Sequence, residues 1–165
     1  MCGNNLILDN DPTFEQVLAE LNTRDLDKYE NFVFCGFGEP TMNLEALVET
    51  AKYLKSKNKI TKLNTNGHGS LINKFDITDS LSGIIDIVSV SLNECNATDY
   101  NKVSVCEFGE EGFYAMIDFV KACVGKIPTI VLTVVDIISP EHIEKCEQIA
   151  KELKVDFRLR QYTEY

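Results

Sequence analysis

The sequence has no long apolar stretch and little positive charge. No run of apolar residues approaches the roughly 20 that a transmembrane helix needs, and residues 1–5 are neither basic nor followed by the apolar stretch of a signal peptide. Lys and Arg number 16 against 26 Asp and Glu, which gives a formal net charge of −10. A surface of that sign repels polyanions. We therefore expect a cytoplasmic protein that binds neither membranes nor nucleic acid.

Closely spaced cysteines are also missing. The six cysteines are spread along the chain, and the closest two are Cys95 and Cys106. None has the spacing of about two to four residues that is typical of zinc knuckles, redox pairs and iron–sulfur runs. Only two histidines, His68 and His142, are present. We therefore assign no metal ligands, and we expect reduced thiols rather than disulfides.

Short β-rich runs alternate with longer amphipathic segments, a pattern typical of a parallel sheet with helical crossovers. We expect strands at about residues 32–35, 61–64, 84–92, 129–135 and 155–159, and longer helices from about residues 14, 44, 108 and 140, with Asn43 as the N-cap of the second. The 165 residues suit one domain, 1–165. A closed eight-fold barrel needs about 250 residues. The prediction is therefore an α/β fold, a partial (β/α) barrel of parallel strands with outer helices. Because a helix precedes the first strand, we expect the first strand of the usual order to be missing.

Glycines and small polar residues gather where the expected strands end. In parallel α/β folds the loops after the strands converge on one rim, where ligands bind. Gly36 and Gly38 allow a ligand to approach the main chain closely, and carbonyl oxygens together with Glu39 could hold an ammonium group. A tight turn with a solvated Glu39 is the alternative. The candidate binding residues on this rim are Gly36, Phe37, Gly38, Glu39, Pro40, Asn64, Asn66, Ser89, Ser91 and Asn93.

The stretch 34–41 resembles the Gly-Gly-Glu-Pro element that follows the second strand of radical S-adenosylmethionine (SAM) enzymes, with Phe37-Gly38 where two glycines are usual. The turn 64–67 and the stretch 89–93 resemble the ends of the third and fourth strands of that superfamily. The resemblance implies that residues 36–40 hold the amino group of SAM, and that the fourth-strand end approaches its ribose and carboxylate. Residues 3–6, 29–41 and 157–160 are similar to the branch associated with TatD-type nucleases.

The resemblance also implies a 4Fe–4S cluster, at which SAM is reductively cleaved to a 5′-deoxyadenosyl radical. The superfamily holds that cluster with a Cys-x3-Cys-x2-Cys loop after its first strand, and the sequence contains no such motif. We therefore expect an N-terminally truncated core that is inactive alone, and we assign no catalytic residue. Cys35, inside a strand, is expected to be a small buried side chain. A missing first strand would bare an edge of the strand 32–35, which predicts either a homodimer through that edge or an edge that is covered.

Two other functions stay open. The chain could be a non-catalytic module that binds SAM or another small ligand, or a metal-dependent hydrolase that uses Glu39, His68, Glu94 and Asp136 near strand ends. Arg158 and Arg160 alternate along a strand and so share a side. They either bind a carboxylate or phosphate of an unidentified small-molecule substrate, or are solvated. Whether the chain is an enzyme is left undecided.

Overall fold

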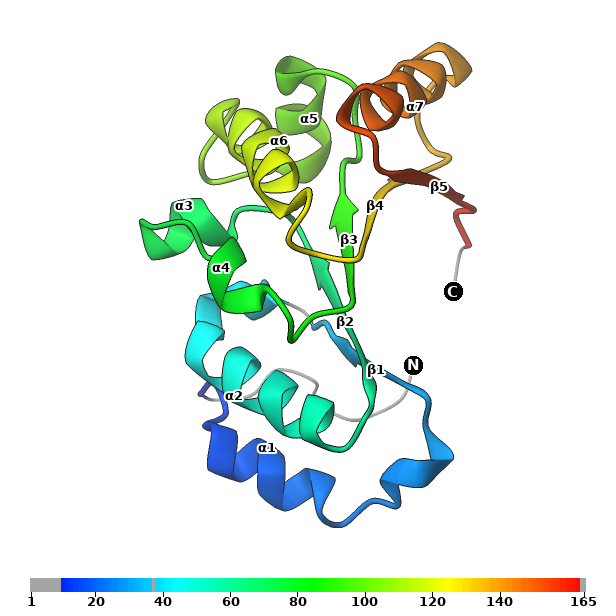
Figure 1. Cartoon of the computed structure of the whole chain (residues 1–165). Coiled ribbons are helices and arrows are strands. Elements are labelled where there is room, and N and C mark those ends of the chain that lie inside the picture. The colour runs from blue at the N-terminus through cyan, green and yellow to red at the C-terminus, as the bar shows by residue number, and fades with distance from the viewer. Residues whose placement is uncertain (1–9, 37, 164–165) are drawn as a thin grey trace.

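The computed structural model describes residues 10–36 and 38–163. Five parallel strands form one sheet in the order β1-β2-β3-β4-β5, so that each strand pairs with the next along the chain (Figure 1). The predicted α/β class, with parallel strands and outer helices, is confirmed. The strands are β1 (Asn31–Phe34), β2 (Ile60–Thr65), β3 (Ile87–Ser91), β4 (Thr129–Val135) and β5 (Asp156–Arg160).

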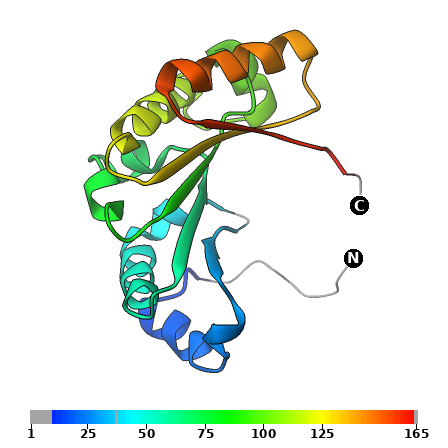
Figure 2. The same cartoon turned by 45° about the vertical axis from the view of Figure 1, so that its right-hand side comes forward.

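The helices lie along one side of the curved sheet (Figure 2). No helix of residues 10–36 and 38–163 covers the other side, which we call the open face. No helix in this part of the chain is long and apolar enough to cross a membrane. The helices are α1 (Phe14–Leu21), α2 (Leu44–Ser56), α3 (Gly69–Asn73), α4 (Thr78–Leu81), α5 (Ala97–Ser104), α6 (Glu111–Cys123) and α7 (Pro140–Leu153), with 3-10 turns at Leu26–Lys28 and Pro40–Asn43.

The core lies between the sheet and the helices. Successive strand residues point to opposite faces, and the apolar residues of the central strands point to the helices. Leu63, Val88 and Leu132 are fully buried in one cluster with Ala51 of α2 and Met116 of α6. The alternate residues of the same strands, which include Lys62, Asn64, Ser89 and Ser91, therefore line the open face.

Helix starts follow the expected capping chemistry at two places and depart from it at a third. Thr13 and Gln16 form a reciprocal capping box at α1, and the Ser139 hydroxyl accepts a hydrogen bond from the His142 amide at α7. Asn43 holds the N-cap position of α2, as predicted, but its side chain makes no capping hydrogen bond. Pro40 begins a 3-10 turn ahead of that helix, and the Asn43 side chain instead donates to the Pro12 carbonyl at 2.8 Å.

Three other sequence predictions need correction. The strand expected at 84–92 is shorter, because the amides of Ile84 and Ile85 bond back to the Leu81 carbonyl. The helix expected from about residue 108 begins at Glu111, after a turn that contains Gly109 at a φ of +58°. The short helices α3, α4 and α5 were not expected. The missing first strand and the homodimer stay predictions, since residues 1–9 lie outside the described residues.

Candidate functional site

Glu39 joins the loop after β1 to the end of β2. Its Oε1 accepts hydrogen bonds from the Thr41 amide (3.2 Å), the Thr41 hydroxyl (2.7 Å) and the Thr65 hydroxyl (2.7 Å). Its Oε2 accepts from the Asn66 amide at 2.8 Å. The carboxylate is half-buried, so the alternative of a solvated Glu39 is wrong. The four bonds fix a carboxylate on the rim where the sequence predicts an ammonium-binding group.

The two loop glycines beside Glu39 are not required by the packing of the described chain. Neither Gly36 nor Gly38 has a positive φ. An added Cβ at Gly38 would meet no described atom within 4 Å, and one at Gly36 would only touch the Gly38 amide at 4.0 Å. Both glycines are exposed, and the predicted site residue Phe37 lies outside the described residues. A ligand approaching this loop would thus meet main chain rather than side chains at both glycines.

The turn after β2 is held by its own side chains. Asn66 Oδ1 accepts from the His68 amide at 2.9 Å, and the Thr65 hydroxyl accepts from the Gly67 amide at 2.9 Å. Gly67 has a φ of +80°, and a Cβ there would lie 2.7 Å from Met116 Cγ. This turn therefore needs glycine both for its backbone angle and for the close approach of α6.

The structure brings some of the predicted site residues together and separates others. Asn64 of β2 lies opposite Ser89 of β3 in the ladder, both on the open face, and Ser91 lies opposite Thr133. Asn93 has a φ of +61°, and its side chain lies 3.4 Å from the Ser104 hydroxyl of α5. Asn93 is thus engaged with the helix layer, whereas Asn64, Ser89 and Ser91 line the open face.

Three cations also share the open face. Lys62 of β2 has a lowered pKa, because burial and then the positive charges of Arg158 and Arg160 disfavour its charged form. Arg158 pairs with Thr133 in the ladder, which confirms that the two arginines share one side of β5 and puts them on the open face. Among the described residues, none of the three cations forms an ion pair. The same register puts Asp156 on this face, so its strand residues carry three cations and one carboxylate, in a chain of net charge −10.

A polar group made of Glu94, Cys95 and His142 lies where the loop after β3 meets the start of α7. The Glu94 side chain is 6% exposed, and its Oε2 lies 2.9 Å from His142 Nδ1 and accepts from the Cys95 amide at 3.1 Å. One ligand atom each of Glu94, Cys95 and His142 lie within 4.8 Å of one another. Sequence spacing did not reveal this trio. The only signal was the Ser139-Pro140 helix start, which puts His142 in the first turn of α7.

The four residues proposed for a metal-dependent hydrolase do not form a site. His68 is buried beside Tyr100, with its Nε2 3.0 Å from the hydroxyl, and burial lowers the pKa of the imidazole. Asp136 accepts from the Tyr162 amide at 2.7 Å. In residues 10–36 and 38–163, the one group of three potential metal ligands contains Glu94 but not Glu39, His68 or Asp136. The hydrolase based on these four residues is therefore wrong.

The described cysteines do not fit a 4Fe–4S cluster. Burial raises the pKa of Cys123 and of Cys146 to about 12, so both are held as thiols. Cys35 is exposed rather than buried, because β1 lies at the edge of the sheet formed by the described residues and Cys35 follows its last ladder position. No three cysteines of the described part of the chain come together, and Cys2 lies outside it. No chemistry of such a cluster is therefore derived for these residues.

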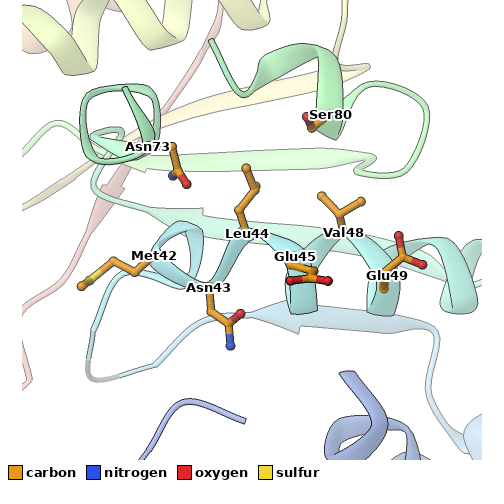
Figure 3. A pocket seen from close by; sticks show the side chains of 8 residues that line it. All are labelled: Met42, Asn43, Leu44, Glu45, Val48, Glu49, Asn73 and Ser80. Carbon is orange, nitrogen blue, oxygen red and sulfur yellow. The ribbon is translucent and has the colours of Figure 1, made fainter. Parts of the chain in front are cut away.

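A hollow of about 520 Å³ lies on the helix side, between α2 and the α3–α4 segment (Figure 3). It is an open groove with two carboxylates, Glu45 and Glu49. None of the predicted binding residues lines it, so it is separate from the rim. Its lining residues are Met42, Asn43, Leu44, Glu45, Val48, Glu49, Asn73 and Ser80.

No protein-family model matches the sequence, and no curated protein matches it. Among solved structures, a radical SAM methyltransferase from Sphaerobacter thermophilus is similar, with a TM-score of 0.44 and 17% sequence identity. The matched region covers 95% of this chain and 60% of that chain. The chain therefore spans less than two thirds of the length of that structure.

Proposed function

We propose that this chain binds SAM at the rim formed by the ends of β1, β2 and β3, as a protein of the radical SAM type from the TatD-associated branch. The observation that carries the proposal is the fixed carboxylate of Glu39. A carboxylate has about four lone-pair sites. Oε1 accepts three donors and Oε2 accepts one, so the remaining accepting capacity lies on Oε2.

The open face offers partners for the rest of the ligand. Asn64, Ser89 and Ser91 supply amide and hydroxyl groups suited to ribose hydroxyls and a carboxylate. Polar groups of this kind at the carboxyl ends of parallel strands are the usual ligand contacts in α/β folds. This arrangement supports binding of an amino-acid-bearing nucleoside.

For the chain as sequenced, the proposed function is binding of SAM without its cleavage. The sequence lacks the Cys-x3-Cys-x2-Cys motif, and the described cysteines do not converge. We therefore propose a non-catalytic SAM-binding module in preference to an enzyme.

Calorimetry on the full chain tests this function with three nucleosides. SAM and S-adenosylhomocysteine carry the α-amino group, whereas 5′-methylthioadenosine does not. Loss of a hydrogen bond to a charged group costs about 1.5–3 kcal/mol, which is roughly a tenfold or larger change in Kd. We expect Glu39→Gln to weaken binding of the first two by at least about tenfold and to leave 5′-methylthioadenosine unchanged.

Glu144→Gln is the matched control, since Glu144 is exposed on α7 and its side chain makes no hydrogen bond among the described residues. This control should bind all three nucleosides as the unaltered chain does. Absence of heat with SAM for the unaltered chain would remove the proposal. Equal weakening of all three nucleosides by Glu39→Gln would show that Glu39 does not read the amino group. The measurements are made at a temperature at which circular dichroism shows every variant to be folded.

A further inference from the structure

We propose that Glu94, Cys95 and His142 bind one zinc-class divalent cation, at a site that is independent of the SAM-binding rim residues. Glu94 and Cys95 come from the loop after β3, and His142 comes from the first turn of α7. His142 is 48 residues from Glu94 in the sequence. The fold, rather than a local motif, therefore creates the trio.

The distances fit a tetrahedral ion after small side-chain movements. Zinc bonds of about 2.0–2.3 Å to oxygen, nitrogen and sulfur put neighbouring ligand atoms about 3.3–3.8 Å apart. The Glu94 and His142 atoms are already 2.9 Å apart, and the three ligand atoms lie within 4.8 Å of one another. Cys95 and His142 are each only half-buried, which leaves their side chains room to adjust toward an ion.

The burial of Glu94 is the second observation that indicates a cation. A buried carboxylate is costly unless it is paired or coordinates a metal. Among the described residues, no Lys or Arg pairs with Glu94, and its Oε1 accepts no hydrogen bond but is not one of the fully enclosed atoms without a partner. Its Oε2 contacts only the Cys95 amide and His142, an imidazole that carries charge only when it is protonated. A divalent ion would neutralise the carboxylate together with a Cys95 thiolate.

Surrounding groups already orient the proposed ligands. Asn96 Nδ2 lies 3.5 Å from Cys95 Sγ and donates to Asp99 Oδ2 at 2.9 Å, so that a donor is directed at the sulfur. The Ser139 hydroxyl holds the His142 amide at the start of α7. Partners of this kind, which orient metal ligands, are a usual part of protein metal sites.

The donor set selects the class of metal. One sulfur, one nitrogen and one oxygen suit zinc and its neighbours, whereas Mg²⁺ and Ca²⁺ prefer oxygen ligands. Three protein ligands leave the fourth tetrahedral position for water or a small ligand, which is the usual composition of zinc sites with an exchangeable position.

Cobalt(II) titration of the reduced full chain, in the absence of SAM, tests the site directly. We expect one equivalent of Co²⁺ to produce a thiolate-to-cobalt charge-transfer band, and one equivalent of Zn²⁺ to remove it. Cys95→Ser should abolish the band, and His142→Gln should weaken Co²⁺ binding at least tenfold. Cys35→Ser, which alters an exposed thiol outside the trio, and Glu39→Gln should both retain the full signal.

Two outcomes would overturn the proposal: no charge-transfer band in the unaltered chain, or a band that survives Cys95→Ser. An ion pair between Glu94 and a protonated His142, with no metal, would give the first outcome. Cys95 and His142 are each only half-buried, so their variants are expected to fold, which circular dichroism checks. Because Glu39→Gln separates the two sites, failure of SAM binding would leave this result intact.

Discussion

Replacing Glu39 by Gln should lower the free energy of unfolding by about 2–4 kcal/mol. The amide that best fits the site keeps its oxygen at Oε1, where three donors converge. Its NH2 group then faces the Asn66 amide, which is also a donor. One hydrogen bond to a charged group is lost, at about 1.5–3 kcal/mol. The three retained bonds also weaken, because charge-assisted bonds are roughly twice as strong as neutral ones.

Urea unfolding followed by circular dichroism measures this loss. For a chain of this size, each 1 kcal/mol corresponds to about 2–4 °C in Tm, so we expect a drop of roughly 5–15 °C. Glu144→Gln should change the free energy of unfolding by less than about 0.5 kcal/mol, as is usual for exposed positions. A loss for Glu39→Gln no larger than that of this control would refute the reasoning.

A double-mutant cycle locates the effect. Thr65→Val removes one of the hydroxyl donors to Glu39. Residues joined by a hydrogen bond usually couple by about 0.5–3 kcal/mol, whereas independent sites are additive. We expect the double variant of Glu39→Gln and Thr65→Val to lose less stability than the sum of the two single losses. Additive losses would mean that Glu39 stabilises the chain through other contacts.

Two further predictions concern α6 and the buried imidazole. In urea titrations, Gly67→Ala should lower the free energy of unfolding by about 1–3 kcal/mol more than Gly83→Ala. Both glycines have positive φ, but only at Gly67 would an added Cβ meet Met116. Equal losses for the two variants would contradict the close approach of α6 to Gly67. Burial lowers the pKa of His68 in the folded chain below its ordinary value of about 6.5. The unfolded chain therefore binds more protons just below that pH, and stability falls as the pH drops through it. Urea unfolding at about pH 7.5 and 5.5 should show a lower free energy of unfolding at the lower pH, and His68→Gln should reduce this difference. A difference that is unchanged in the variant would exclude His68 as its cause.

The fold was largely predictable because alternating apolar runs and amphipathic segments are local features. The approximate positions of all five strands and the parallel arrangement followed from them. The errors have physical causes in contacts between distant segments. Asn43 is at the N-cap position of α2, but its side chain makes no capping bond, because a proline turn starts earlier and Pro12, 31 residues away, accepts from that side chain. Cys35 is exposed because β1 lies at the edge of the sheet among residues 10–36 and 38–163. Strand periodicity alone does not reveal this position.

The candidate site was predictable residue by residue but not as an arrangement. Glu39 and Asn66 were both identified on strand ends, yet the hydrogen bond between them joins residues 27 positions apart. The hydrolase candidates were also near strand ends. His68, however, points to Tyr100 in the helix layer. The end of a strand indicates the rim, whereas the direction of each side chain depends on packing.

The strand order has a consequence for how the chain folds during synthesis. Each of β2 to β5 pairs with the strand before it in the sequence, so the partner of each has already been synthesised when it emerges. Synthesis proceeds from the N-terminus at about 5–20 residues per second, and none of β2 to β5 depends for its first pairing on a later strand. The bonds of Glu39 to Thr65 and Asn66 can form as soon as β2 leaves the ribosome, long before β5. The loop after β1 would then be in place early, and the Glu94, Cys95 and His142 trio would be completed only when α7 docks.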